Sequence, residues 1–485
     1  MPLSAAFVQQ CRVLLGNRQV ISDPESLRVY ECDALSAYRQ VPDLVVLPDS
    51  VAQVRALLKL CNQHSIPVVA RGAGTGLSGG ALPVSGGIVL GLSKMNRILA
   101  VDPLNCSATL QPGVRNLAIS AAAKPYGLYY APDPSSQIAC SIGGNVAENA
   151  GGVHCLKYGL TVHNVLQIKL VTLEGRLLTL GGSGLDMPGY DLLALAIGSE
   201  GLLGVVVEIT VRLLPLQPQT QVLLAAFASV EQAGAAVAAL IADGLTPAGL
   251  ELMDNAAIRA TEAFVHAGYP VNAAAILLCE LDGMPEQVAA DSQRAIGILQ
   301  HNAAVEIRTA SDEPERRRFW AGRKSAFPAV GRIASDYYCM DGTIPRKQLA
   351  CVLQRISAMA EACGLSVVNV FHAGDGNLHP LILYDARIRG DFEKAEVLGG
   401  QILELCVAVG GTITGEHGVG HEKLAQMCVQ FQAAELAQFH RLKRAFDPFG
   451  LLNPGKAIPT LHRCAELGHL HVHHGQLPHP ELERF

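Results

Sequence analysis

Hydrophobic and polar residues recur with two different periods along the chain, and these periods predict its elements. Between residues 50 and 64 the apolar positions follow helical spacing, at Val54, Leu57, Leu58 and Cys61. That spacing predicts an amphipathic helix, and Ser50 with Gln53 forms a capping-box pattern at its start. Short apolar runs predict buried strands at 45–48, 66–70, 87–90 and 205–211. This order of strands and helices indicates an α/β or α+β domain.

A second alternation of strands and helices begins after Pro215 and Pro218, two nearby prolines that are typical of a linker. The predicted strands are 222–227, 249–253, 274–281 and 305–309. The predicted helices are 232–242, 255–265 and 286–300. A doubled βαβ pattern of this kind resembles a ferredoxin-like cap. We therefore divide the chain into a helical segment at 1–45, a first domain at 46–217, a cap domain at 218–445 and a C-terminal segment at 446–485.

Composition narrows the class of protein. At 485 residues and 51.2 kDa the chain exceeds the usual size of a single core. A net charge of −6 without a long basic run argues against nucleic acid as the main partner. The 13 cysteines include no Cys-x-x-Cys pair, which predicts neither a disulfide framework nor an iron–sulfur site and fits a reducing cytosol. No signal peptide is expected, and the apolar window 222–241 is interpreted as a strand and a helix rather than a membrane span.

Three glycine-rich segments follow predicted strands or turns in the first domain. Residues 71–80 read Arg-Gly-Ala-Gly-Thr-Gly-Leu-Ser-Gly-Gly, and the others are 141–152 and 198–204. Exposed N–H groups in such a loop form an anion-binding concavity. The first segment lacks the Lys-Ser/Thr of a P-loop and the third glycine and acidic residue of a Rossmann fingerprint. An ordinary glycine-rich turn is the alternative for one loop alone, whereas three loops favour a long dinucleotide.

These segments, together with Pro132-Asp-Pro-Ser-Ser136, resemble the FAD-binding domain of the vanillyl-alcohol oxidase type, and in particular its D-2-hydroxyacid dehydrogenase branch. The resemblance implies an α+β fold with a two-subdomain FAD-binding domain, a ferredoxin-like cap and a C-terminal helical segment. It implies that the pyrophosphate of FAD is held by Arg71, Gly72, Ala73, Gly74, Thr75, Gly76 and Ser78. The rest of FAD would be lined by Pro132, Ser135, Ser136, Gly143, Asn145, Asn149, Gly198, Glu200, Gly201, Gly204 and, from the similar motif 447–456, Asn453. His154 lacks a matching tethering motif, so we expect non-covalent FAD.

Candidate chemistry is concentrated in two later loops. His372 and His379 flank a Gly-Asp-Gly turn, and Glu416 with His417 lies in a second glycine-flanked loop. A strand predicted at 366–371, directly before His372, and another starting at His379 would bring both imidazoles to one sheet edge. The loop with Glu416 follows a further strand predicted at 411–414. Neutral imidazoles suit zinc, iron or manganese, and a carboxylate supplies a further ligand. The alternative is that these polar residues only cap turns.

The same resemblance assigns roles to these residues. His372, His379 and Glu416 would bind a divalent metal, and His417 would act as the base. Arg323 matches the arginine that binds the substrate carboxylate. Lys324 and Arg332 are interpreted as surface charges, with a role of Arg332 on the other side of the substrate as the alternative.

Leu381 stands where relatives acting on 2-hydroxyglutarate carry an asparagine, which favours a short monocarboxylic acid such as glycolate or D-lactate. The tail, including the histidine-rich stretch 462–474, resembles the glycolate-oxidase group of this branch and is expected to be disordered or to contact a partner. That group implies a second flavin-type subunit and an iron–sulfur subunit, with a cytoplasmic location and membrane attachment only through partners. A stand-alone D-lactate dehydrogenase and a non-catalytic flavin- or metal-binding regulatory subunit are the alternatives.

Overall fold

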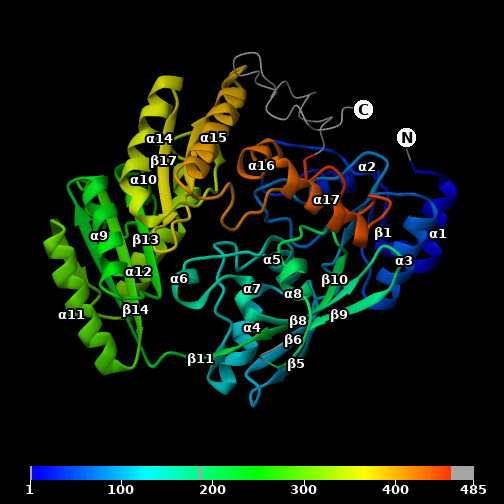
Figure 1. Cartoon of the computed structure of the whole chain (residues 1–485), viewed down its shortest axis with the longest axis horizontal. Helices are drawn as coiled ribbons and strands as arrows, with labels where there is room; N and C mark the ends of the chain where they lie inside the picture. The colour runs from blue at the N-terminus through cyan, green and yellow to red at the C-terminus, as the bar shows by residue number, and fades with distance from the viewer. Residues whose placement is uncertain (1–2, 185–187, 460–485) are drawn as a thin grey trace. The chain divides into compact units, whose positions relative to one another are not determined.

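The computed structural model describes residues 3–184 and 188–459, which form two compact units (Figure 1). Of the described residues, unit 1 contains 3–150, 160–184, 188–215 and 417–459, and unit 2 contains 151–159 and 216–416. The cap domain predicted from the sequence ends at residue 445, whereas unit 2 ends at Glu416. Residues 151–159 belong to unit 2 although they lie inside the first predicted domain.

Unit 1 contains two main sheets. The first has the strand order β1-β2-β4-β3, with parallel pairing of β2 with β4 and of β4 with β3. The second is antiparallel with the order β5-β6-β10-β8-β9. The strands are β1 Val20–Ile21, β2 Leu44–Val46, β3 Val68–Arg71, β4 Ile88–Gly91, β5 Ile98–Asp102, β6 Ser107–Leu110, β7 Leu128–Tyr129, β8 Val165–Val171, β9 Leu177–Gly181, β10 Val205–Arg212 and β11 Leu214–Pro215. The helices are α1 Ala5–Leu15, α2 Pro24–Leu27, α3 Val51–Gln63, α4 Asn116–Ala123, α5 Ile142–Glu148, α7 Thr161–Asn164, α8 Leu192–Ala196, α16 Leu424–Gln430 and α17 Ala433–Phe446.

The predicted helix at 50–64 is confirmed as α3, and the Ser50 hydroxyl accepts a hydrogen bond from the Gln53 N–H as expected of an N-cap. Its four predicted apolar residues are all buried. The purely helical prediction for 1–45 is wrong, because β1 pairs with β2. At the other end of the chain, Leu452 forms a parallel bridge with Val68, so the C-terminal segment lies beside β3.

Unit 2 is one antiparallel sheet of seven strands in the order β15-β12-β14-β13-β17-β18-β16. Its first four strands have the order of a ferredoxin-like sheet, as predicted, with an extra helix between the second and third in sequence. The strands are β12 Gln219–Phe227, β13 Gly249–Asp254, β14 Ala275–Gly283, β15 Ala304–Thr309, β16 Asp336–Cys339, β17 Ser366–His372 and β18 Pro380–Tyr384. The helices are α6 Cys155–Tyr158, α9 Val230–Ala242, α10 Asn255–Val265, α11 Pro285–His301, α12 Glu313–Lys324, α13 Ala326–Val330, α14 Leu349–Cys363 and α15 Asp391–Ala408.

Alternating side chains of the central strands face opposite sides of this sheet. Val222 and Leu224 of β12 pack into a core with Phe319 and Trp320 of α12. Helices α9 and α11 pack against β12 and β14, and α14 packs against β17. The result is a sheet buried by helices, which explains the nearly continuous apolar strands.

The apolar window 222–241 is a strand followed by a helix, as predicted. Within residues 3–184 and 188–459, no helix is both long and apolar enough to cross a membrane. The cysteines of this described part are free thiols. The histidine-rich stretch 462–474 lies outside the described residues.

Candidate functional site

The first glycine-rich loop follows β3, and its backbone offers a row of N–H donors. Among the described residues, the backbone N–H groups of 73–78 make no hydrogen bond within the chain. Gly74 has a φ of 74°, and a side chain there would collide with the Arg71 guanidinium. Arg71 donates from Nη1 to the Cys32 carbonyl at 2.7 Å, which fixes its side chain beside the loop. Successive free N–H groups next to a cation fit a pyrophosphate, as the sequence predicts.

The second glycine-rich segment packs directly against the first. A side chain at Gly72 would collide with the Ser141 hydroxyl, so the two loops approach at van der Waals distance. The hydroxyl oxygens of Ser78 and Ser141 are buried and have no hydrogen-bond partner in the described part of the chain. Because buried hydroxyls are normally satisfied, a polar ligand at this place would complete them. The orphaned hydroxyls and free N–H groups therefore fit the phosphates of FAD.

Other predicted flavin residues hold this region together. Asn145 donates to Asn116 Oδ1 at 2.9 Å, and Asn116 donates to the Pro132 carbonyl at 2.9 Å. Asn149 accepts from the Val162 N–H. Of the predicted hydroxyls, Ser135 is exposed and Ser136 is half-buried in the same turn. The predicted glycines of this region serve close packing: Gly143 lies against Pro112, Gly198 against Asn149, Gly201 against Ala70 and Asn453, and Gly204 against Leu170.

Glu200 and Asn453 make their hydrogen bonds to the chain itself. The Glu200 carboxylate accepts from the N–H groups of Val419 and Gly420, each at 2.7 Å. Asn453 donates to the Gly80 carbonyl at 3.0 Å and to the Glu200 carbonyl at 2.7 Å. Both residues therefore join glycine loops that are distant in sequence. Direct contact of their side chains with FAD stays a prediction.

A second buried carboxylate lies beside Glu200. Side chains at Gly80 or Gly418 would meet Glu148 oxygens, and Gly418 also faces Glu200. Burial, followed by the charge of Glu200, raises the pKa of Glu148 well above its ordinary value. Since Glu200 is satisfied by two N–H donors and Glu148 Oε2 has no hydrogen-bond partner within the described residues, Glu148 is the carboxyl that keeps a proton.

We expect Glu148→Gln to reduce the loss of stability as pH rises from 5 to 8. A carboxyl with a raised folded pKa stabilises the protein fully below the unfolded pKa, and this contribution is lost as pH rises through the folded pKa. For wild type the free energy of unfolding should therefore fall by up to about 1.4 kcal/mol per pH unit from this group. Denaturant unfolding of both proteins between pH 5 and 8 measures the difference, and parallel curves would contradict it.

The two histidines of unit 2 meet across a tight hairpin. His372 ends β17 and His379 directly precedes β18, and Gly376 between them has a φ of 82°. The Asp375 carboxylate accepts from the Asn377 N–H and stabilises the turn. The imidazole centroids lie 5.1 Å apart with nearly perpendicular planes. The sequence prediction that both imidazoles reach one sheet edge is confirmed.

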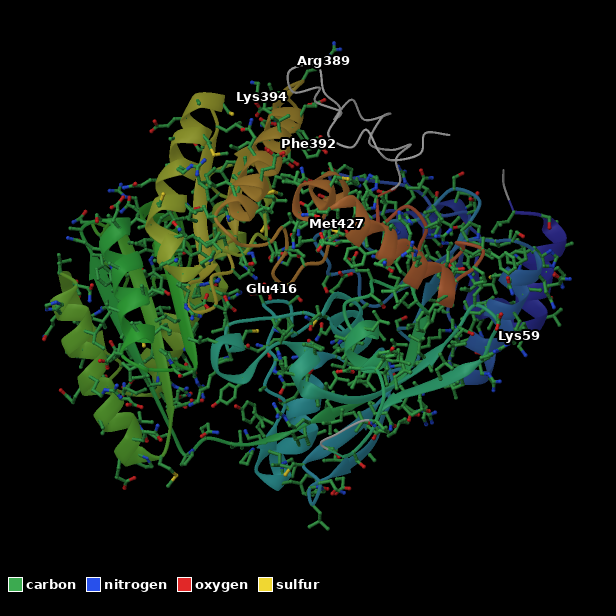
Figure 2. The ribbon with its side chains drawn as sticks, viewed as in Figure 1. Lys59, Arg389, Phe392, Lys394, Glu416 and Met427 are labelled. Atoms are coloured by element: carbon green, nitrogen blue, oxygen red, sulfur yellow. The ribbon has the colours of Figure 1, made fainter. Side chains whose placement is uncertain are left out.

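Glu416 joins this pair, although its predicted strand is wrong. In place of a strand at 411–414, Thr412 forms only an isolated bridge with Thr343. The loop is held by Asp341, a fully buried residue that accepts from Thr414 Oγ1 at 2.6 Å and from the N–H of Glu416 at 3.2 Å. Figure 2 labels Glu416 on this segment after α15. Its Oε1 lies 3.0 Å from His379 Nε2 and 3.5 Å from His372 Nε2.

Opposite charges outweigh the effect of burial on the pKa values of Glu416 and His372. Burial alone would raise the pKa of Glu416, but the imidazoles of His372 and His379 beside it hold the pKa well below its ordinary value. Burial likewise opposes charge on His372, yet the carboxylates of Glu251 and Glu416 raise its pKa well above the ordinary value. His372 Nε2 is buried without a hydrogen-bond partner within the described residues. Two imidazoles and one carboxylate are a donor set of catalytic zinc sites, and their ligand atoms lie within 4.8 Å of one another. The residues therefore fit a divalent metal.

Glu251 is a site residue that the sequence analysis missed. It lies on β13 directly opposite His372 of β17. Its Oε1 is 2.7 Å from His372 Nδ1, and its Oε2 accepts from Arg323 at 2.7 Å from Nε and 2.6 Å from Nη2. Arg323 is 2% exposed. The predicted substrate arginine is thus already engaged along one edge of its guanidinium group.

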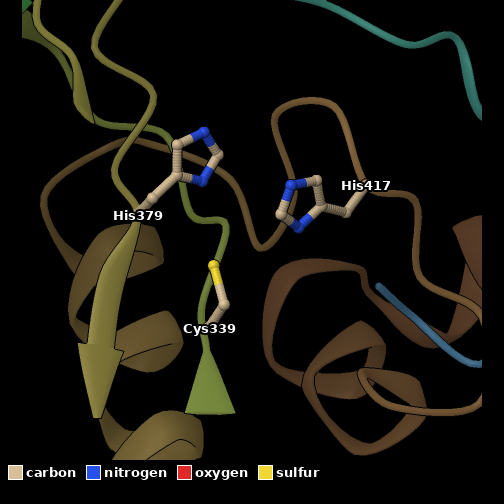
Figure 3. A group of neighbouring side chains, drawn as sticks. All are labelled: Cys339, His379 and His417. Carbon is tan, nitrogen blue, oxygen red and sulfur yellow. The ribbon is translucent and has the colours of Figure 1, made fainter. Parts of the chain in front are cut away.

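Four further side chains complete the description: Cys339, His417, Lys324 and Arg332. Figure 3 shows Cys339 at the end of β16 and His379 before β18, and their ligand atoms lie within 4.8 Å of each other. It also labels His417, the predicted base, which follows Glu416 directly in the chain. The predicted surface charges Lys324 and Arg332 are both exposed.

Comparison with known proteins identifies the family to which this chain belongs. Residues 42–181 match the model of an FAD binding domain, and residues 216–457 match the C-terminal domain of FAD linked oxidases. The glycolate oxidase subunit GlcD of Escherichia coli K12 is 63% identical over 467 residues, which cover 96% of this chain and 94% of that protein. The chain belongs to the FAD-linked oxidases.

Other members of this family and its fold are also similar. The Bacillus subtilis glycolate oxidase subunit GlcD is 39% identical over 88% of this chain and 91% of its own. A D-lactate dehydrogenase of Archaeoglobus fulgidus is 34% identical over 91% of this chain and 98% of its own. The structure of p-cresol methylhydroxylase superimposes with a TM-score of 0.79 at 20% identity, covering 94% of this chain and 97% of that one. These comparisons confirm the FAD-linked oxidoreductase and the predicted two-domain fold class.

Proposed function

We propose that this FAD-linked oxidase converts a short 2-hydroxy acid into the corresponding 2-oxo acid, with glycolate as the first candidate and D-lactate as the second. The proposal rests on the buried cluster of His372, His379 and Glu416. Arg323 is connected to this cluster through the Glu251 carboxylate, which pairs with both Arg323 and His372. Metal ligands beside an arginine suit a substrate with a hydroxyl and a neighbouring carboxylate. The similarity to glycolate oxidase subunits and to a D-lactate dehydrogenase supports the same pair of substrates.

The residues of this chain have separate tasks in the proposed reaction. When bound, FAD supplies the hydride acceptor, held by the 71–78 loop and the serines beside it. A divalent metal held by His372, His379 and Glu416 would supply Lewis acidity at the 2-hydroxyl. Arg323 attracts the substrate carboxylate through the part of its guanidinium group that Glu251 does not occupy. His417 takes the hydroxyl proton, which a neutral imidazole does near physiological pH.

The preference for a small substrate is proposed from Leu381. This residue is fully buried in the core of unit 2, two positions after His379 on β18. A buried aliphatic side chain offers no hydrogen bond to a second carboxylate, which would remain unsatisfied at a high cost. A substrate with one carboxylate is therefore favoured over 2-hydroxyglutarate.

Anaerobic flavin reduction tests the function. We expect the flavin absorbance of the purified full-length protein to bleach with glycolate or D-lactate, and much more slowly with 2-hydroxyglutarate. A stopped-flow series over substrate concentration ranks the three acids. Faster reduction by 2-hydroxyglutarate would contradict the proposed substrate size, and no bleaching by any of them would favour a regulatory flavin-binding subunit.

The electron acceptor is proposed to be a partner protein. GlcD of E. coli is named as a subunit of a glycolate oxidase, which supports assembly with other subunits here. We propose a second flavin-type subunit and an iron–sulfur subunit as these partners, with attachment to a membrane only through them. The reduced sample of the preceding experiment, mixed with oxygen, should reoxidise slowly. Rapid reoxidation would instead favour direct oxidase activity of the chain alone.

A further inference from the structure

Glu251 connects two groups that the proposed function uses separately. One of its oxygens faces His372 Nδ1 at 2.7 Å, and the other accepts two hydrogen bonds from Arg323. The three side chains are almost completely buried, with relative exposures of 0% for Glu251 and 3% for each partner. The antiparallel register of β13 and β17 places Glu251 and His372 opposite each other, so the contact is built into the sheet.

This contact determines which nitrogen of His372 carries a hydrogen. An ionised carboxylate only accepts hydrogen bonds, so Nδ1 must be the donor. In a neutral imidazole the lone pair then lies on Nε2, the atom 3.5 Å from Glu416 Oε1. Nε2 is also the nitrogen without a hydrogen-bond partner in the described part of the chain. A carboxylate that orients a metal-binding histidine in this way commonly improves metal affinity.

Arg323 in turn determines which atoms of Glu251 are available. Its guanidinium group presents Nε and Nη2 as a planar fork to Oε2. The fork keeps Oε2 away from His372 and leaves Oε1 for the imidazole. The position of the arginine and the tautomer of the histidine therefore depend on the same carboxylate.

We propose that Glu251 is a positioning residue that sets the tautomer of His372 for metal binding and at the same time orients Arg323 toward the substrate carboxylate. The inference rests on the proposed function because it assumes a metal at His372, His379 and Glu416. It goes beyond that function by assigning a role to a residue outside the ligand set.

Glu251→Gln is the sharpest test because it conserves shape. The amide oxygen will face the two Arg323 donors, so the amide N–H group must face His372 Nδ1. Nδ1 then becomes the acceptor, and Nε2 carries the hydrogen where a metal needs a lone pair. We expect Zn²⁺ to bind about 10- to 100-fold more weakly. Competition with a fluorescent zinc chelator on the full-length flavoprotein measures the dissociation constant without relying on activity.

Glu280→Gln is the matched control. Glu280 lies in unit 2 on β14, is also buried, and pairs with His154 Nε2 at 3.0 Å and Trp320 Nε1 at 2.5 Å. This variant removes the charge of a buried carboxylate that lies between a histidine and a second hydrogen-bond donor. None of the proposed metal ligands is among these two partners. It should bind Zn²⁺ as wild type does. An equal loss of Zn²⁺ affinity in both variants would show a general effect of burying an amide and would overturn the inference.

Two further outcomes are decisive. Wild-type Zn²⁺ affinity in Glu251→Gln would overturn the inference while leaving the metal site of the proposed function intact. Absence of Zn²⁺ binding by wild type would overturn both. If Glu251→Gln does not fold, Glu251→Asp keeps the charge for Arg323 but withdraws the oxygen from His372. Its Co²⁺-substituted form should then show weaker, shifted d–d absorption, whereas an unchanged spectrum would overturn the inference.

Discussion

Replacing His379 by alanine is expected to remove the metal and to slow flavin reduction by about 1,000-fold or more. His379 Nε2 is the nitrogen nearest to Glu416 Oε1, at 3.0 Å, and its side chain is 3% exposed. A Lewis acid at the substrate hydroxyl contributes several kcal/mol to the transition state, which corresponds to a factor of this size. Metal analysis of the purified variant and stopped-flow reduction by glycolate measure the two effects.

The FAD content of the His379→Ala variant should not change. The predicted pyrophosphate loop at 71–78 and the orphaned serines belong to unit 1, whereas His379 belongs to unit 2. The matched control is His301→Ala, which removes an exposed histidine at the end of α11 in the same unit. A His379→Ala protein that retains both metal and rate would mean that the trio is a structural ion-pair cluster.

The local pattern of apolar and polar residues was sufficient to predict most helices and strands, but not all of them. Helix α3 follows directly from the periodicity of its buried side, and strand β10 follows from a nearly continuous run of buried, mostly β-branched residues. The run 411–414 looks equally strand-like, yet only Thr412 finds a bridge partner. A strand forms only where an adjacent strand pairs with it in register, and the sequence alone does not show which segment that adjacent strand is. The same reason explains why β1 was missed within residues 1–45.

The candidate metal residues were predictable because they are clustered in short glycine-flanked motifs. The residues that hold them were not, since Glu251 is 121 positions from His372 and Asp341 is 75 positions from Glu416. One signal was available for Glu251, which is a lone charge within the apolar strand 249–253. A buried charge in a core strand requires a partner of opposite charge or several donors. Sequence alone identifies the need for such a partner but not the partner itself.

His417→Asn is expected to lower the rate of flavin reduction by about 100- to 10,000-fold, the usual contribution of a general base. Asparagine retains polarity and similar size but has no nitrogen that accepts a proton near neutral pH. Unlike His379→Ala, this variant should retain its metal, because His417 is not one of the proposed ligands. Anaerobic stopped-flow reduction and metal analysis distinguish the two variants, and added imidazole should restore part of the rate.

The backbone around His417 explains why this base should be well positioned. On one side, Asp341 accepts from the N–H groups of Gly415 and Glu416 at 3.1 and 3.2 Å. On the other side, Glu200 accepts from Val419 and Gly420, each at 2.7 Å. Since charge-assisted hydrogen bonds are about twice as strong as neutral ones, the peptide before His417 and the peptides after it are both held firmly.

A substitution confined to the imidazole leaves these anchors unchanged, so the loop should keep its conformation in His417→Asn. His440→Asn provides the matched control, because His440 on α17 has a different partner: its Nε2 contacts the Pro459 carbonyl at 3.1 Å. Wild-type reduction by His417→Asn, alongside wild-type reduction by the control, would move the role of base to another group. Loss of rate without rescue by imidazole, together with lost metal, would instead make His417 a ligand.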